Sequence, residues 1–215
     1  MLSFNGGAMF DGIIFDLDGT LWNATKIICK TWNIILKDYE NVRKEPITVS
    51  ELERCMGLQL DKIGERLFKN TDYNTRKELM DKCCTLECEY LSREGGVLFP
   101  DLESTLQVLS KKYKLFIVSN CQNGYIESFY AGHNLAKYFT DQLCAEETGL
   151  SKGENNKIII KRNNIKKAVY IGDTQGDRQS ALDANIPFVY AEYGFGNVDG
   201  YDYKIEKFSD LLKIF

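Results

Sequence analysis

Two acidic side chains directly follow an apolar run near the N-terminus of the chain. Residues 13–15 are Ile, Ile and Phe, and segment 16–20 reads DLDGT. Such a run predicts a buried β-strand, which ends here in two carboxylates and a turn. One carboxylate can act as a nucleophile while the other transfers protons. Two negative charges at the end of a buried strand are unfavourable without a cation between them, so the spacing also indicates a divalent metal, and oxygen ligands favour Mg²⁺.

Three further segments place polar groups at the end of a strand or the start of a helix. The apolar segment 114–118 precedes Ser119 and Asn120, and Lys152 opens a stretch with helical periodicity. The apolar segment 169–171 precedes the segment 172–177, which reads GDTQGD. An aspartate pair at a strand end is by itself more often a turn or a helix cap than a catalytic site. The assignment therefore depends on all four segments occurring together in this order.

Together these segments resemble the four motifs of the haloacid dehalogenase (HAD) superfamily of phosphohydrolases. Within it they resemble the phosphoglycolate-phosphatase-like subgroup with a helical (type C1) cap, over residues 10 to about 196. The resemblance implies a Mg²⁺-dependent phosphatase that hydrolyses a small phosphorylated metabolite through an aspartyl-phosphate intermediate. It makes 2-phosphoglycolate the default substrate.

The resemblance also implies roles for the acidic residues. Asp16 is the expected nucleophile, since a carboxylate needs no deprotonation at pH 7. Asp18 is expected to protonate the leaving oxygen and then to activate water, with a pKa raised by crowding with Asp16. Asp177 has an alternative explanation as an acid in the first turn of a helix. The expected Mg²⁺ ligands are Asp16, Asp18 through its main-chain carbonyl, Asp173, and Asp177 directly or through water.

Four polar residues are expected to bind substrate. Ser119 would donate a hydrogen bond to the phosphoryl group, and Lys152 would supply a fixed positive charge. Lys152 is preferred to the nearby lysines 157 and 161 because it precedes the helix, where the family's lysine falls. The other two expected contacts, for which turn chemistry is nearly as good an explanation, are Thr20 and Asn120.

The elements that must position these residues follow two patterns. Segment 23–94 is helical by periodicity, with apolar stripes at 28/32/35/39, 60/63/67/68 and 79/83/86/90 and a capping box at Ser50 and Glu53. After Gly95 and Gly96, helices near 101–112, 125–130, 154–162 and 177–184 alternate with strands at 114–118, 169–171 and 188–190. Such alternation predicts a parallel sheet with helices on both faces.

The predicted fold class is therefore α/β. It comprises a doubly wound parallel (Rossmann-like) sheet core, residues 1–22 and 95–215, and a small all-helical cap domain, residues 23–94, inserted after the first strand. Ligands of such sheets bind beyond the carboxyl ends of the strands, where Asp16, Ser119 and Asp173 lie. Segment 55–58 (CMGL) resembles the cap loop that enters the active site in capped members of the superfamily. Residues 1–8 are expected to be irregular.

Bulk properties exclude several classes of function. The 215 residues carry 27 Lys and Arg against 31 Asp and Glu, a net charge of -4, which argues against nucleic acid as a partner. No apolar stretch is long enough to span a membrane and no signal peptide is evident, so a cytoplasmic protein is expected. The seven cysteines are expected to be reduced thiols, with packing favoured over metal binding at Cys84 and Cys88. The sequence is compatible with a monomer and with a dimer.

His133, the single histidine, argues against hydrolases of the Ser-His-Asp and Cys-His types and is expected on the surface or in a loop. Three other functions agree less well with the sequence. A β-phosphoglucomutase-like phosphotransferase would need to exclude water, and no sequence feature supplies that. A haloacid dehalogenase would not need Asp18. A non-enzymatic phosphate-sensing module would need a long-lived phosphoryl state, which Asp18 as a dephosphorylating acid and base disfavours.

Overall fold

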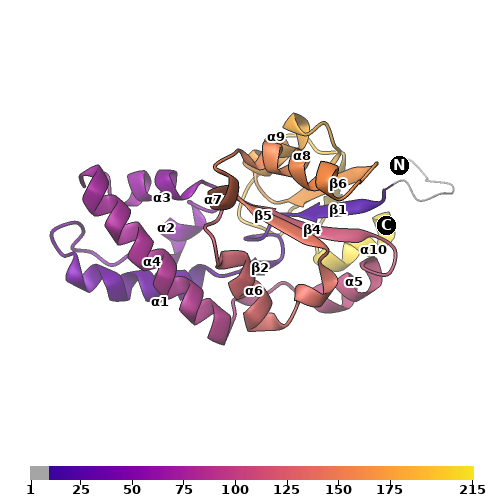
Figure 1. Ribbon diagram of the computed structural model, residues 1–215. Helices are drawn as coiled ribbons and strands as arrows, with labels where there is room; N and C mark the ends of the chain where they lie inside the picture. Colours follow the sequence, from indigo (N-terminus) through magenta and orange to yellow (C-terminus); the bar gives the residue numbers. More distant parts are fainter. Residues whose placement is uncertain (1–9) are drawn as a thin grey trace.

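A six-stranded, all-parallel sheet forms the centre of the larger part of the molecule (Figure 1). The computed structural model describes residues 10–215. The strand order is β5-β4-β1-β6-β7-β8. The strands are β1 (Gly12–Phe15), β4 (Lys114–Ser119), β5 (Asp141–Cys144), β6 (Ala168–Gly172), β7 (Phe188–Ala191) and β8 (Tyr203–Ile205).

The register of the three central strands brings their ends together. Phe15, the last residue of β1, pairs with Ile117 of β4 and with Ile171 of β6. All four residues of β1 are buried, as its apolar sequence predicts. Because all three strands run in the same direction, the residues that follow them meet at one edge of the sheet.

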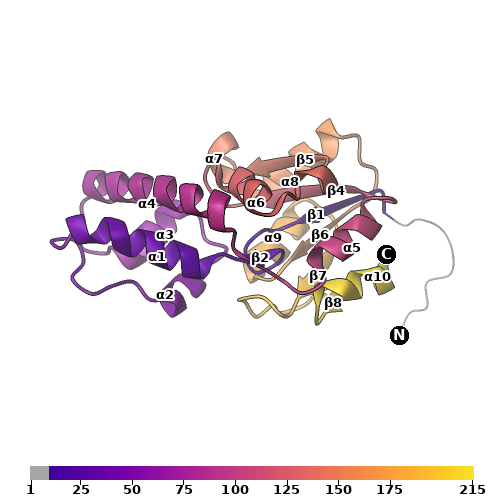
Figure 2. The same ribbon diagram turned by 90° about the horizontal axis from the view of Figure 1, so that it is seen from below.

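Helices cover both faces of the sheet, as Figure 2 shows. Alternate strand residues face opposite sides, so Ile13 and Phe15 pack on one face and Ile14 and Tyr170 on the other. The first face is covered by α5 (Leu102–Leu109), α6 (Tyr125–His133) and α10 (Leu211–Ile214), and the second by α8 (Lys152–Arg162) and α9 (Gln175–Asp183). The short α7 (Ala145–Thr148) follows β5. The doubly wound core is therefore confirmed.

A helical cap lies beyond one end of the sheet (Figure 1). It contains α1 (Thr25–Ile35), α2 (Val49–Glu53), α3 (Leu60–Leu67) and α4 (Tyr73–Glu94), and α1 packs along α4. A two-stranded antiparallel ribbon, β2 (Trp22–Asn23) with β3 (Val97–Leu98), joins the cap to the core. The insertion of a helical cap after the first strand is confirmed, while the exact boundaries at 23 and 94 stay predictions.

The capping box in the cap was predicted at the wrong residues. The N-cap of α2 is Thr48, not Ser50, and its side chain accepts a hydrogen bond from the backbone of Glu51. The Glu51 carboxylate in turn accepts from the backbone N–H of Thr48 at 2.9 Å and also pairs with Arg43 at 2.8 Å. The backbone of Thr48 is extended, as an N-cap requires, and the contact of Glu51 with Arg43 supports this cap. The helix therefore begins two residues earlier than predicted.

Several short strands were missed from the sequence. The edge strands β5 and β8 and the ribbon β2–β3 have two to four residues each and no clear apolar run. They form because a neighbouring strand supplies their hydrogen bonds, as β4 does for β5 and β7 for β8. The expectation for residues 1–8 lies outside the described part of the chain.

The prediction that His133 lies on the surface or in a loop is wrong. His133 is the last residue of α6 and is half-buried against Trp22, with ring centroids 5.8 Å apart. Trp22 also meets Tyr125 and Phe129 edge to face, at 5.7 and 5.1 Å, and is fully buried. This aromatic cluster anchors the first strand of the ribbon to the core.

We expect Trp22→Ala to lower the free energy of unfolding by roughly 3–5 kcal/mol, because it removes a fully buried aromatic side chain and leaves a cavity. Urea denaturation followed by circular dichroism measures the change. Leu182→Ala, at a position 53% exposed, is the control and is expected to change stability by about 0.5 kcal/mol or less. Equal losses in the two variants would contradict the anchoring role of Trp22.

Candidate active site

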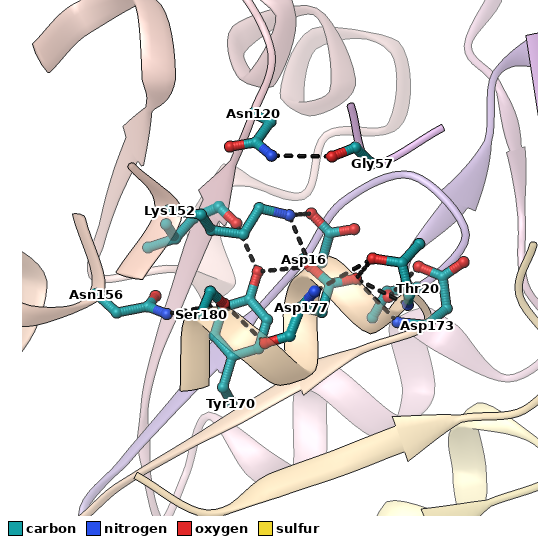
Figure 3. A network of polar contacts seen from close by, with 12 residues as sticks. Asp16, Thr20, Gly57, Asn120, Lys152, Asn156, Tyr170, Asp173, Asp177 and Ser180 are labelled. Atoms are coloured by element: carbon teal, nitrogen blue, oxygen red, sulfur yellow. Dashed lines mark hydrogen bonds and ion pairs between the residues drawn. The ribbon is translucent and has the colours of Figure 1, made fainter. Parts of the chain in front are cut away.

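Three carboxylates meet at the carboxyl ends of β1 and β6 (Figure 3). Asp16 follows β1, Asp173 follows β6, and Asp177 lies in the first turn of α9. All three are buried, and one oxygen from each lies within 4.8 Å of the others. Among the described residues this is the group of His, Cys, Asp and Glu side chains whose geometry could hold a metal ion.

Lys152 lies against two of these acids. Its Nζ is 2.7 Å from Oδ1 of Asp16 and 2.7 Å from Oδ1 of Asp177, and its side chain is 6% exposed. Burial alone would lower the pKa of Lys152, but the charges of the two acids outweigh it and hold the pKa well above its ordinary value. The helix α8 begins at Lys152 with a capping box between Ser151 and Glu154, so the backbone fixes where this side chain starts.

Asp177 has both oxygens engaged. Oδ1 accepts from Lys152, while Oδ2 accepts from the backbone N–H of Thr174 at 2.9 Å and from its hydroxyl at 2.7 Å. The Thr174 side chain in turn accepts from the backbone N–H of Asp177, which completes a capping box. Asp177 is therefore both an acid in the first turn of a helix, as the alternative explanation expected, and a member of the acidic cluster.

Asp173 is held by contacts from two loops. The backbone N–H of Phe195 donates to its Oδ2 at 2.7 Å, and the Thr20 hydroxyl lies 3.4 Å from its Oδ1. Gly19 has a φ of +84°, and a Cβ there would lie 2.2 Å from Oδ2 of Asp173. Burial and the neighbouring carboxylates of Asp177 and Asp16 raise the pKa of Asp173. Three acids with a single lysine leave an excess of negative charge, and this all-oxygen donor set fits a hard divalent cation.

The two acids of the first motif have different surroundings. Burial, and then the charge of Asp177, raises the pKa of Asp16 to about 7. Burial also raises the pKa of Asp18 to about 6, against the effect of the Tyr125 hydroxyl, which donates to Asp18 at 2.9 Å. The expected cause, crowding with Asp16, is therefore not the main one. The Asp18 carboxylate lies outside the three-acid cluster, so only its main-chain carbonyl stays a candidate ligand.

A cavity of about 50 Å³ lies over these acids, between core and cap. Asp16, Asp18, Ser119 and Lys152 line it from the core. The cap loop 55–58 reaches the cavity through Met56, Gly57 and Leu58. The side-chain amide of Asn120 donates to the Gly57 carbonyl at 2.9 Å (Figure 3).

Gly57 has a φ of +81°, and a Cβ there would lie 3.1 Å from the Thr174 side chain. A glycine at this position therefore lets the cap loop approach the core closely.

Sequence reasoning missed one acid of this cavity. Glu87 of α4 is 2% exposed and lines the cavity from the cap, where it accepts hydrogen bonds from the Trp32 indole and the Gln122 amide. Burial raises its pKa to about 8. A signal was available, because Glu87 falls four residues from both Cys83 and Leu91 on the buried stripe of α4, where an apolar residue is expected.

We expect stability to depend on pH through Glu87. A carboxyl group with a higher pKa in the folded than in the unfolded protein stabilises the fold fully below about pH 4, and this stabilisation is lost as the pH rises through 8. Between pH 5 and pH 8, the free energy of unfolding should therefore decrease less in Glu87→Gln than in wild type. The two decreases should differ by about 1.4 kcal/mol or more, which corresponds to one pKa unit. Urea denaturation at both pH values measures it.

The matched control is Glu94→Gln, an exposed acid at the end of the same helix, which should keep the wild-type pH dependence. The same pH dependence in Glu87→Gln as in wild type would contradict the assignment.

Comparison with known proteins places the chain in a family. The model of haloacid dehalogenase-like hydrolases matches residues 13–191. A phosphoglycolate phosphatase of Aquifex aeolicus is 27% identical over 214 residues, covering 94% of this chain and 95% of that protein. The structure of a predicted phosphoglycolate phosphatase from Haemophilus somnus has a TM-score of 0.85 at 22% identity, covering 97% and 99% of the two chains.

A mutant of CbbY from Rhodobacter sphaeroides, solved with xylulose-(1,5)bisphosphate, shares the fold with a TM-score of 0.79 at 12% identity, covering 94% of this chain and 96% of that one. The family match spans most of the chain, including all the residues of the acidic cluster. The chain therefore belongs to the haloacid dehalogenase-like hydrolases.

Proposed function

We propose that the protein is a Mg²⁺-dependent phosphatase that hydrolyses a small phosphorylated metabolite through an aspartyl phosphate on Asp16. The observation that carries this proposal is the buried cluster of three acids and Lys152 at the strand ends, with a second acid, Asp18, in the same cavity. Phosphoglycolate phosphatases among the relatives support it.

In this reaction an oxygen of Asp16 forms a bond to phosphorus while the bond from phosphorus to the ester oxygen breaks. Asp18 gives its proton to the departing oxygen. It then takes a proton from water, whose oxygen attacks the phosphorus and releases Asp16 and inorganic phosphate. The raised pKa of Asp18, about 6, suits a group that must carry the proton in one step and accept it in the next.

The phosphoryl oxygens would be held by Lys152 and Ser119. Lys152 is fixed by two acids and brings positive charge to the place where Asp16 attacks. Ser119 lines the same cavity from the end of β4. The Thr20 hydroxyl is directed to Asp173, so we assign Thr20 to positioning that acid, while Asn120 contacts the cap loop and is available to substrate.

Mg²⁺ would be held by the carboxylates of Asp16 and Asp173 and by the Asp18 main-chain carbonyl. Asp177, whose Oδ1 pairs with Lys152 and whose Oδ2 accepts from Thr174, would bind the ion directly or through water. When bound, the ion supplies positive charge that offsets the repulsion between Asp16 and an incoming phosphate.

The cap, proposed as residues 23–94, would close over the substrate and exclude water from the first step. Among the described residues, no helix combines the length and the apolar character needed to cross a membrane.

Asp16→Asn should reduce phosphate release at least about 100-fold, because the amide is not a nucleophile, while the fold is kept or made more stable by relief of charge crowding. Hydrolysis of p-nitrophenyl phosphate with Mg²⁺, together with the melting temperature, checks both points. Asp199→Asn, an exposed acid outside the cavity, is the matched control and should keep wild-type activity. A variant that keeps more than a few per cent of the wild-type rate would rule out Asp16 as the nucleophile.

Removal of divalent metal with a chelator should abolish hydrolysis, and added Mg²⁺ should restore it and raise the melting temperature, because the cation binds the folded acidic cluster. Ca²⁺ should raise the melting temperature but support little activity, since it tolerates looser coordination. Asp173→Asn should raise the Mg²⁺ concentration for half-maximal activity about tenfold or more. Full activity in chelator would refute the metal site.

A further inference from the structure

The active-site cavity contains one acid for which the proposed reaction has no use. Glu87 enters from the cap and faces the same cavity as Asp16 and Asp18. We propose that Glu87 makes this enzyme select phosphate esters whose leaving group is uncharged or cationic and donates hydrogen bonds, a small diol, polyol or amino alcohol. It would reject leaving groups with a carboxylate, glycolate included. The proposal rests on the phosphatase function proposed above and names its substrate class.

The position of Glu87 is fixed by contacts from both parts of the molecule. Its Oε2 accepts from the indole N–H of Trp32 in α1 of the cap. Its Oε1 accepts from the side-chain amide of Gln122, which follows β4 of the core. Each oxygen keeps a free lone pair, because a carboxylate oxygen can accept two hydrogen bonds. The group is therefore held in place while it can still accept a bond from a ligand.

Among the described residues that line this cavity, no cationic side chain is free to pair with a carboxylate of the substrate. Lys152 is the single cationic side chain among the described residues that line it, and its ammonium already contacts Asp16 and Asp177 at 2.7 Å. In the proposed reaction the same ammonium serves the phosphoryl group. Above its pKa of about 8 the carboxyl group of Glu87 is ionised, and an anionic leaving group would then face this charge. That costs binding free energy which a hydroxyl or an amine does not lose.

A second acceptor in the cavity wall points to the same ligand chemistry. Oδ1 of Asn120 is buried and has no hydrogen-bond partner among the described residues, while the amide nitrogen donates to Gly57. A buried acceptor without a donor is unfavourable, so a hydroxyl or ammonium placed here would gain a bond. The rest of the wall is largely apolar, and it includes Ile28, Trp32, Leu52, Met56 and Ile63.

The cleft next to the cavity is lined mainly by acidic residues, which carry the same sign of charge as an ionised Glu87. A larger cleft of about 840 Å³ between cap and core shares the wall residues Leu60, Asn120, Cys121 and Gln122 with the active-site cavity. Two basic residues line this cleft, Arg76 and Lys77, and Lys77 is paired with Asp81 at 2.8 Å. Five acidic residues line it, namely Asp61, Glu65, Asp81, Glu89 and Glu146. The field at the entrance therefore also disfavours additional negative charge on a substrate.

Three phosphate esters of similar length test the proposal on the full chain with Mg²⁺ at pH 9, where Glu87, with a pKa of about 8, is ionised. They are 2-phosphoglycolate, 2-hydroxyethyl phosphate and phosphoethanolamine, which differ in ending with a carboxylate, a hydroxyl or an ammonium. We expect kcat/KM for each of the last two to exceed that for 2-phosphoglycolate by about tenfold or more. Equal values, or a preference for 2-phosphoglycolate, would overturn the proposal.

Hydrolysis of p-nitrophenyl phosphate in the same assay distinguishes a failure of the proposed substrate class from a failure of the proposed phosphatase function. If this ester is hydrolysed and 2-phosphoglycolate is preferred among the three, the substrate class is wrong while the phosphatase function stands. If neither it nor any of the three esters is hydrolysed, the proposed function fails and the substrate class fails with it.

Glu87→Gln tests whether this residue causes the expected preference against 2-phosphoglycolate. At pH 9 it removes the charge at nearly constant shape, so the ratio of kcat/KM for 2-hydroxyethyl phosphate over 2-phosphoglycolate should fall at least about threefold. Glu94→Gln, on the same helix and outside both cavities, should leave the ratio unchanged. An unchanged ratio in a folded Glu87→Gln variant would overturn the role of Glu87, and if that variant does not fold, the wild-type ratio alone decides.

Discussion

The contact between Lys152 and the acids Asp16 and Asp177 is the interaction on which the site depends. Three buried carboxylates within 4.8 Å of one another would repel strongly without a positive charge among them. The protein offsets this repulsion with one buried lysine and with backbone N–H groups directed at Asp173 and Asp177. The remaining negative charge is what a divalent cation would balance, so such a cation would also stabilise the fold.

The parallel sheet makes this concentration of charge possible. Because β4, β1 and β6 are adjacent and in register, their ends present Ser119, Asp16 and Asp173 at one edge without long loops. Helices α8 and α9 then begin at the same edge, and each starts with a capping box that sets the direction of Lys152 or Asp177. Strand ends and helix starts thus bring all four charged groups together.

The cap completes the cavity through two polar contacts with the core. Asn120 binds the carbonyl of Gly57, and Gln122 binds Glu87, both across the boundary between core and cap. Helix α4 of the cap also packs on α6 of the core, and the aromatic cluster around Trp22 anchors the connecting ribbon. Opening the cap would break these contacts, and closing it would return Glu87 to the cavity. Proteins of this fold include one solved with a sugar bisphosphate as well as relatives named for phosphoglycolate, so the fold by itself does not separate such ligands.

The sequence by itself determined the fold class and the position of Asp16, Ser119 and Asp173, because apolar strands followed by polar residues in a parallel α/β pattern must bring those residues to one edge. Only the tertiary structure decided the edge strands β5 and β8, whose few residues are strands because a neighbour pairs with them. It also decided the position of Glu87 in the cavity wall. Its partners Trp32 and Gln122 are 55 and 35 residues away in the sequence, so their meeting depends on how α1, α4 and the core pack, which no local pattern of residues contains.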